Sequence, residues 1–201
     1  MTPLFFVLSS PSGGGKSSLA RALVSADKKL YLSISLTTRQ PRPYEVDGAD
    51  YHFVTHATFR EKQPDFLEST TVFGHRYATL RSPIQRALDR NQDVLFDIDS
   101  HGMQLLKMAY PSHTFVTIYI WPPSWEVLQN RLEQRRGETG AALQQRIASA
   151  QNTVKEESPF YDYWVVNDNF DQARKDLTHI VQAARLRVTQ QDTLRKRLLL
   201  S

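Results

Sequence analysis

The sequence predicts an α/β protein built on a parallel β-sheet that is flanked by helices. The first observation is that short apolar runs alternate with segments of helical spacing, as in successive strand and helix units. The second is a glycine-rich loop that directly follows the first apolar run. The runs that we interpret as strands are Leu4–Leu8, Tyr31–Leu36, Val94–Ile98, Phe115–Trp121 and Trp164–Val166.

The composition narrows the class of protein. A chain of 201 residues can bury a core and fits one domain with insertions. It has no cysteine, which excludes disulfides and thiolate metal sites and fits a reducing cytosol. No apolar run approaches membrane-spanning length, and a net charge of +4 suits phosphorylated small molecules better than nucleic acid. We therefore expect a cytoplasmic protein without membrane or nucleic-acid partners, whose oligomeric state the sequence leaves open.

The glycine-rich loop has the features of a phosphate-binding loop. It reads Ser-Pro-Ser-Gly-Gly-Gly-Lys-Ser over residues 10–17. Its glycines let consecutive N–H groups face phosphate oxygens, Lys16 adds a charge, and Ser17 offers a hydroxyl to Mg²⁺. A helix beginning near Lys16 adds its positive end. A flexible linker is the alternative, but the preceding strand and the amphipathic segment that follows disfavour it, so the loop predicts a site for a nucleoside triphosphate.

One position departs from the usual G-x-x-x-x-G-K-S/T pattern of such loops. Ser10 stands where the first glycine belongs. Since residues other than glycine tolerate a positive φ poorly, we expect Ser10 to strain the loop and Ser10→Gly to relieve that strain.

Two stretches interrupt the alternation and predict insertions over the nucleotide site. Residues 37–83 form the first, and residues 135–146 form the second, a lid between two segments of helical spacing. The predicted core then comprises residues 1–36, 84–134 and 147–201. In the first insertion, Arg39 and Arg42 lie three residues apart with Tyr44 close behind, a set that suits a monophosphate because guanidinium groups bind phosphate bidentately. A solvated charged turn is the alternative.

Phe66-Leu67-Glu68 and Gly74-His75-Arg76-Tyr77-Ala78-Thr79 complete a pattern that resembles the guanylate kinase family of P-loop NTPases over about Leu4 to Leu177. The resemblance implies transfer of the γ-phosphoryl group of MgATP to GMP, giving ADP and GDP in purine nucleotide metabolism. Two alternatives stay open: a non-catalytic guanylate-kinase-like module that binds proteins, and a kinase of another small phosphorylated acceptor.

The resemblance also implies roles for individual residues. ATP contacts are expected at Ser12, Gly13, Gly14, Gly15, Lys16, Ser17, Ser18 and Asn167. GMP contacts are expected at Ser35, Arg39, Arg42, Glu45, Tyr51, Glu68, Tyr77, Thr79 and Asp99, with Glu68 and Thr79 on the guanine edge and Arg39, Arg42, Tyr51 and Tyr77 on the phosphate. Charge in the transferring group would be stabilised by Lys16, Arg42, Arg135 and Arg146.

Three of these expectations depend on register or on departures from the family. Strand alternation puts Asp97 and Asp99 on one face, but spacing alone leaves open which serves Mg²⁺. We expect Asp97 to contact the water shell of Mg²⁺, which Ser17 binds directly, and we expect Asp99 to contribute to the acceptor pocket. Alignment with the lid of the family without a gap selects Arg135 as the lid arginine, whereas alignment on the Arg-Gly pair at residues 136–137 would select Arg136. Ser10, Tyr44 and Ala78 replace family glycines, so we expect altered loop geometry there.

Overall fold

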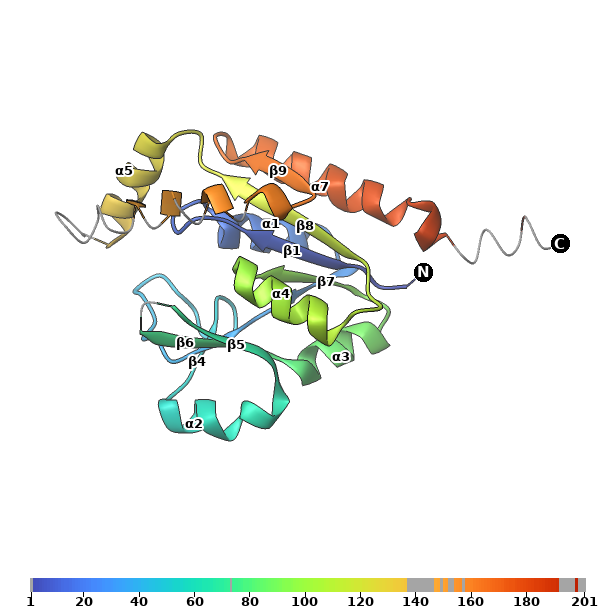
Figure 1. Cartoon of the computed structure of the whole chain (residues 1–201), viewed down its shortest axis with the longest axis horizontal. Helices are drawn as coiled ribbons and strands as arrows, with labels where there is room; N and C mark the ends of the chain where they lie inside the picture. Colours follow the sequence, from blue (N-terminus) through green and yellow to red (C-terminus); the bar gives the residue numbers. More distant parts are fainter. Residues whose placement is uncertain are drawn as a thin grey trace.

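The structure, a computed structural model, describes residues 2–72, 74–136, 147–148, 150–151, 154–156, 158–191 and 198. Its described residues form one five-stranded sheet in the order β2-β7-β1-β8-β9 and one four-stranded sheet in the order β4-β3-β6-β5 (Figure 1). The strands of the first sheet are β1 (Phe5–Ser9), β2 (Leu30–Ser33), β7 (Asp93–Asp97), β8 (Phe115–Trp121) and β9 (Tyr163–Val166). Every pairing between them is parallel, which confirms the predicted α/β class.

Helices cover both faces of this core sheet. They are α1 (Lys16–Ala26), α3 (Arg81–Asp89), α4 (Ser100–Ala109), α5 (Trp125–Arg136) and α7 (Phe170–Arg185). Because side chains alternate along a strand, Phe6 and Leu8 of β1 pack towards α1 and α7, while Phe5 and Val7 pack towards α3 and α4. Burial on both faces explains why β1 is a continuous apolar run. In Figure 1, α1 and α7 lie on one side of the sheet and α4 on the other.

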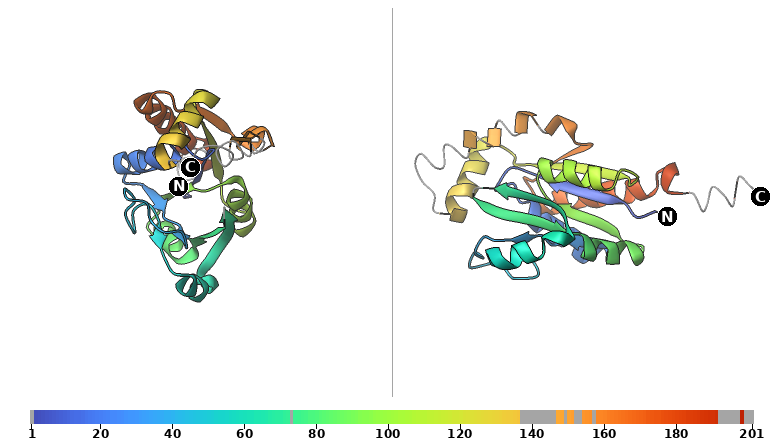
Figure 2. Two further views of the ribbon diagram at one scale, coloured as in Figure 1. Left: turned by 90° about the vertical axis from the view of Figure 1, so that its left-hand side faces the viewer. Right: turned by 60° about the horizontal axis from the view of Figure 1, so that its bottom comes forward.

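The second sheet lies beside the core and has its own small apolar centre. Its strands are β3 (Leu36–Thr37), β4 (His52–Phe53), β5 (Phe66–Val72) and β6 (His75–Leu80). Between β4 and β5 the chain forms α2 (His56–Glu61) and a short 3₁₀ turn at Gln63–Asp65. Leu36, Phe59 and Ala78 are buried together there. Both views in Figure 2 show this sheet on one side of the core. Two further 3₁₀ turns span Ser158–Phe160 and Val188–Gln190.

The apolar run Tyr31–Leu36, predicted as one strand, is divided between the two sheets. Ser33 pairs with Phe96 in the core, whereas Leu36 pairs with Ala78 in the second sheet. Between them the carbonyl of Ser35 accepts a hydrogen bond of 2.9 Å from the His52 N–H. The single-strand prediction is therefore wrong, because the backbone of the last residues exchanges its hydrogen-bond partners from one sheet to the other. Ser35 consequently lies where the two sheets meet.

The part of α5 with described side chains carries Leu128 and Leu132, which pack with Ile147. Apart from the backbone of residues 135 and 136, the predicted lid lies outside the described residues. The division into a core, an insertion and a lid stays a prediction.

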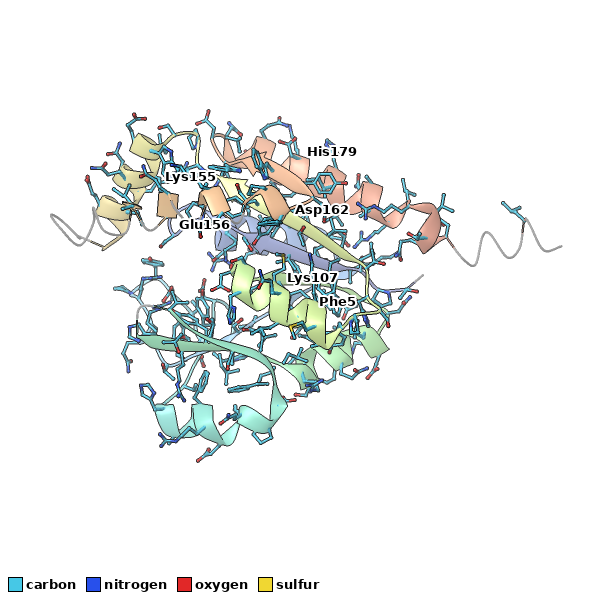
Figure 3. All side chains as sticks on the ribbon, in the orientation of Figure 1. Phe5, Lys107, Lys155, Glu156, Asp162 and His179 are labelled. Atoms are coloured by element: carbon cyan, nitrogen blue, oxygen red, sulfur yellow. The ribbon has the colours of Figure 1, made fainter. Side chains whose placement is uncertain are left out.

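An aromatic cluster fixes the amino-terminal end of β1. Phe5 stacks on His113 with a centroid distance of 4.6 Å and meets Tyr110 and Phe115 edge to face. Figure 3 labels Phe5 near Lys107, away from Lys155 and Glu156. The other end of β1, where the glycine-rich loop begins, is held by pairing of Leu8 with Asp97 and of Ser9 with Tyr119. No helix in the described ranges is long and apolar enough to cross a membrane.

Candidate active site

The glycine-rich loop connects β1 to α1 and is shaped by two glycines in the left-handed region. Gly13 has φ of 91° and Gly15 has φ of 90°, conformations that side chains disfavour. The Gly14 N–H donates to the carbonyl of Pro11 at 3.0 Å, and α1 begins at Lys16 directly after Gly15. The loop therefore ends at a helix N-terminus, where unpaired N–H groups and the helix dipole favour an anion.

The expected strain at Ser10 is absent. Among the described residues other than glycine, only Asn91 has a positive φ, so Ser10, Tyr44 and Ala78 all occupy conformations open to any residue. The Ser10 hydroxyl donates to the Pro11 carbonyl at 3.0 Å, and its side chain lies against Gly14. The expectation of a strained loop at Ser10 is therefore wrong, because the left-handed turns fall at Gly13 and Gly15.

Lys16 and Ser17 meet the carboxylate at the end of β7. The Lys16 ammonium contacts Oδ1 of Asp97 in an ion pair whose two side chains are mostly buried. Ser17 and Asp97 line one cavity, together with Ser35 and Tyr51. Hydroxyl and carboxylate oxygens are the ligands that Mg²⁺ prefers, so this pair fits the ion. Within the described ranges no group of three or more His, Cys, Asp or Glu side chains could hold a metal, so a bound Mg²⁺ would also need phosphate oxygens and water.

Ser12 and Ser18 are exposed at the two ends of this loop, while Asn167 is only 6% exposed. The Asn167 side-chain amide donates to the carbonyl of Gly14 at 2.9 Å. The structure thus brings Asn167 to the loop.

Arg39 and Arg42 converge on Glu45 in the segment that connects β3 to β4. The guanidinium of Arg39 binds both carboxylate oxygens of Glu45 at 2.9 Å, and Arg42 adds its N–H and its side chain at 2.8 Å each. Burial acts to raise the pKa of Glu45, but hydrogen bonds from the two arginines lower it overall. Burial acts to lower the pKa of Arg39, but hydrogen bonds to Glu45 and Tyr77 raise it overall. The result is a charged cluster of fixed geometry with a net positive charge.

Two aromatic rings lie close to the guanidinium of Arg39. Its guanidinium carbon lies 5.5 Å from the centroid of the Tyr51 ring and 5.7 Å from that of Phe53. The rings of Tyr51 and Tyr77 meet edge to face at 5.8 Å. Burial raises the pKa of Tyr51, so its hydroxyl keeps its proton and can donate to an anion. The predicted phosphate-binding residues therefore lie together.

Glu68 of β5 is a buried carboxylate with one oxygen in use. The Thr79 hydroxyl donates to Oε1 at 2.5 Å, while Oε2 has no hydrogen-bond partner among the described residues. A Cβ on Gly102 would lie 3.5 Å from Oε2 and 3.3 Å from Oδ1 of Asp99, so Gly102 keeps the space between the two carboxylates open. Burial raises the pKa of Glu68; the Thr79 bond opposes this rise and the charge of Asp99 adds to it.

The two aspartates do not share a strand face. β7 ends at Asp97, and Asp99 is the N-cap of α4, whose Oδ1 accepts the Gly102 N–H at 2.8 Å. The alternation argument fails because the chain leaves the strand after Asp97. Asp97 instead lies beside Lys16, and Asp99 lies near Glu68.

Two predicted residues fall outside this geometry. Arg135 lies on the last turn of α5, where side chains are not described, and Arg146 lies outside the described residues. Arg136 is the last residue of α5, and its side chain is likewise not described.

Sequence reasoning missed an ion pair between Arg21 of α1 and Asp50. Oδ2 of Asp50 also accepts the Val46 N–H at 2.9 Å, and both members of the pair line the cavity of Ser17. Arg21 follows Ser17 by four residues, so helical spacing could have placed both on one face. The pair joins the helix of the phosphate loop to the segment that carries the arginines.

The fold and the glycine-rich loop define a P-loop protein, in which the loop and the cluster of Arg39, Arg42 and Glu45 are two candidate anion sites. Comparison with known proteins narrows this class. The guanylate kinase family model matches residues 3–184, so the chain belongs to the guanylate kinase family. It is 44% identical over 188 residues to a guanylate kinase of Nitrosomonas europaea, with 92% of each chain covered, and 43% identical over 198 residues to one of Alkalilimnicola ehrlichii, covering 96% and 95%. The crystal structure of a guanylate kinase from Anaplasma phagocytophilum superposes with a TM-score of 0.77 at 26% identity, covering 98% of this chain and 95% of that one.

Proposed function

We propose that this chain is a guanylate kinase that transfers the γ-phosphoryl group of MgATP to GMP and so forms ADP and GDP. The family and the named relatives support this activity. The observation that carries the choice of acceptor is Glu68, a buried carboxylate beside Asp99 with one oxygen that has no hydrogen-bond partner among the described residues.

Glu68 and Thr79 match the hydrogen-bonding edge of guanine. Guanine offers N1–H and the 2-amino group as adjacent donors, which a carboxylate accepts side by side, and its O6 accepts from a hydroxyl. Adenine has an unprotonated N1 and a donor at position 6, so it would leave buried polar groups unpaired. Asp99, near Glu68, is the third member of this pocket. Arg39, Arg42, Tyr51 and Tyr77 bind the phosphate of GMP, and Ser35, which lines a cavity with Tyr51, is a further GMP contact.

Glu45 acts on GMP through the arginines. Both of its oxygens already accept hydrogen bonds from Arg39 and Arg42, so its role is to hold these side chains in place. This refines the contact implied by the sequence resemblance.

The ATP side uses the loop and the groups at its end. Backbone N–H groups of residues 12–18 and the ammonium of Lys16 bind the β- and γ-phosphates. Ser17 would hold Mg²⁺ directly and Asp97 would hold it through water, and the bound ion would neutralise phosphate charge. Because Asp97 pairs with Lys16 in the nucleotide-free chain, ATP exchanges this ion pair for contacts with phosphate.

Transfer needs no general base in this scheme. The acceptor is a phosphate whose second pKa is about 6, so it is an anionic nucleophile at neutral pH. Catalysis then depends on positioning, on charge stabilisation by Lys16, Arg42, Arg135 and Arg146, and on exclusion of water. Residues 37–83 and 135–146 supply that exclusion as an acceptor-binding insertion and a lid. The ungapped register through α5 favours Arg135 over Arg136 as the lid arginine.

The two alternative functions fit this site less well. A module that only binds proteins would not need Lys16 paired with Asp97 or a loop with two left-handed glycines. A kinase of another small acceptor has no use for the unpartnered oxygen of Glu68. The partners are therefore small nucleotides and not nucleic acid or membrane. A cytoplasmic location follows because ATP and GMP are cytoplasmic metabolites.

The test combines purified protein with MgATP and GMP and quantifies ADP and GDP. The proposal expects equal amounts of both products, little ATP hydrolysis without GMP, and loss of both when EDTA removes Mg²⁺. Absence of GDP would refute the activity. Binding of GMP without turnover would support the non-catalytic alternative.

A further inference from the structure

Asn167 lies at a position that the core sheet fixes. It directly follows β9, and its backbone N–H donates to the carbonyl of Trp121 at 2.8 Å, which extends the pairing of β8 with β9 by one residue. The side chain is turned inwards, and the residue is 6% exposed. A buried amide held by a strand end can position whatever it contacts.

The contact of this amide is the phosphate-binding loop, 153 residues away in the sequence. Nδ2 of Asn167 donates to the carbonyl oxygen of Gly14 at 2.9 Å. The amide also lies directly against Gly15, where a Cβ would be 2.2 Å from Nδ2. Gly15 is therefore required for the close approach of Asn167 as well as for its own φ of 90°.

The hydrogen bond sets the orientation of one peptide plane. Gly14 C=O and Gly15 N–H belong to the same planar trans peptide, so they point in opposite directions. With the carbonyl held by Asn167, the Gly15 N–H faces away from Asn167. Gly15 is the N-cap of α1, so its N–H lies at the end of the helix where amides lack intrahelical acceptors and can bind an anion.

A second set of contacts joins the same loop to α5. A guanidinium nitrogen of Arg131 donates to the backbone carbonyl of Asn167 at 3.0 Å. Leu128 and Leu132, on the same helix, lie within 3.2 to 3.3 Å of the position that a Cβ on Gly13 would occupy. The loop is thus supported at Gly13 by the leucines and at Gly14 by Asn167, which Arg131 ties to α5.

We propose that Asn167 is a positioning residue that fixes the Gly14–Gly15 peptide for phosphate binding and connects the loop to α5 through Arg131. This inference rests on the proposed function for its nucleotide. It assigns Asn167 to the phosphate loop and not to the adenine base. It therefore predicts that Asn167 acts on any triphosphate chain, whether or not a base is attached.

The experiment measures binding of Mg-ATP and of Mg-tripolyphosphate, which carries no base, by titration calorimetry. Asn167→Asp replaces the donor by an acceptor that faces the Gly14 carbonyl, and Asn167→Ser shortens the side chain beyond reach. Both variants should bind ATP and tripolyphosphate about tenfold more weakly or worse, in equal proportion. The KM for GMP should stay within about twofold, since the acceptor pocket is untouched. Asn130→Asp, the same change at an exposed position of α5, should alter none of these values.

Two outcomes would overturn the inference. Weaker ATP binding with unchanged tripolyphosphate binding would assign Asn167 to the base, and unchanged binding of both would remove it from the site. Should both variants fail to fold, the Gly15 amide signal in the NMR spectrum of the unaltered protein decides: it must shift when Mg-tripolyphosphate is added, and a constant signal contradicts the proposal. A wild-type protein that binds tripolyphosphate but forms no GDP would refute the proposed function and leave this inference standing.

Discussion

The two terminal guanidinium nitrogens of Arg39 lie 2.9 Å from the two carboxylate oxygens of Glu45, in a side-by-side arrangement. The same carboxylate also binds Arg42. One acidic residue therefore determines where two cations lie. The cluster keeps one net positive charge, which we propose binds the phosphate of GMP.

Glu45→Gln should raise the KM for GMP by about tenfold, because a neutral amide cannot hold both guanidinium groups. The variant gains one positive charge, which favours an anion, but it also leaves two mostly buried guanidinium groups without their shared partner. Loss of positioning should outweigh that gain. Steady-state kinetics at two salt concentrations provide the measurement, with Glu61→Gln on α2 as the matched control. Tighter binding of GMP by Glu45→Gln would show that charge matters more than positioning.

Lys16→Met should lower kcat by about 100-fold to 1,000-fold, since it removes a charge directed at the transferring phosphate. The unaltered methylene stem keeps the packing of the loop. Asp97 loses its ion-pair partner, so thermal unfolding must be followed alongside turnover. Lys28→Met, at an exposed turn after α1, serves as the control. Near-normal turnover of Lys16→Met would exclude the assigned role.

Ser10→Gly should leave the KM for ATP and kcat unchanged within about twofold, because Ser10 has no left-handed strain to relieve. The additional freedom of glycine in the unfolded chain should lower the free energy of unfolding by about 0.5–1 kcal/mol. Denaturant titration measures this change, and Ser112→Gly in an exposed turn is a suitable comparison. A clear gain in ATP affinity would restore the strained-loop interpretation.

Glu68 should give GMP binding an unusual dependence on pH. Burial raises its pKa, so protonation begins at a higher pH than for an exposed glutamate and removes the acceptor that guanine needs. The KM for GMP should therefore rise on acidification in the unaltered protein and to the same extent in Glu61→Gln, which keeps Glu68. In Glu68→Gln the KM for GMP should be about 5-fold to 100-fold higher at neutral pH and should lose this dependence.

The same pKa has a consequence for stability. A folded-state pKa above the unfolded value means that the folded chain binds the proton more tightly, so this group stabilises the fold as the pH falls through the folded-state pKa. In its charged form, the buried Glu68 opposes folding. Glu68→Gln should therefore raise the melting temperature of the nucleotide-free protein at neutral pH. A lower melting temperature would show that the Thr79 bond outweighs the burial of charge.

The core sheet could be predicted from sequence because its central strands β1, β7 and β8 are buried on both faces and read as continuous apolar runs. The second sheet could not: β3 and β4 have two residues each, and β5 carries a run of polar residues from Glu68 to Thr71 between its apolar ends. The types of individual residues, such as Arg39 and Lys16, were enough to predict that the site binds anions. The partners of the site residues could not be predicted, because contacts such as that of Asn167 with Gly14 join distant segments and no local pattern encodes them.

Acceptor discrimination tests the central claim most directly, because it depends on the unpartnered oxygen of Glu68. The measurement is kcat/KM of the unaltered protein for GMP, AMP, CMP and UMP at saturating MgATP. Two or three unmatched polar groups, at about 1–3 kcal/mol each, predict a preference for GMP over AMP on the order of a thousandfold. Glu68→Ala should reduce that preference mainly through weaker GMP binding. Equal use of AMP and GMP by the unaltered protein would contradict the assignment of this pocket to guanine.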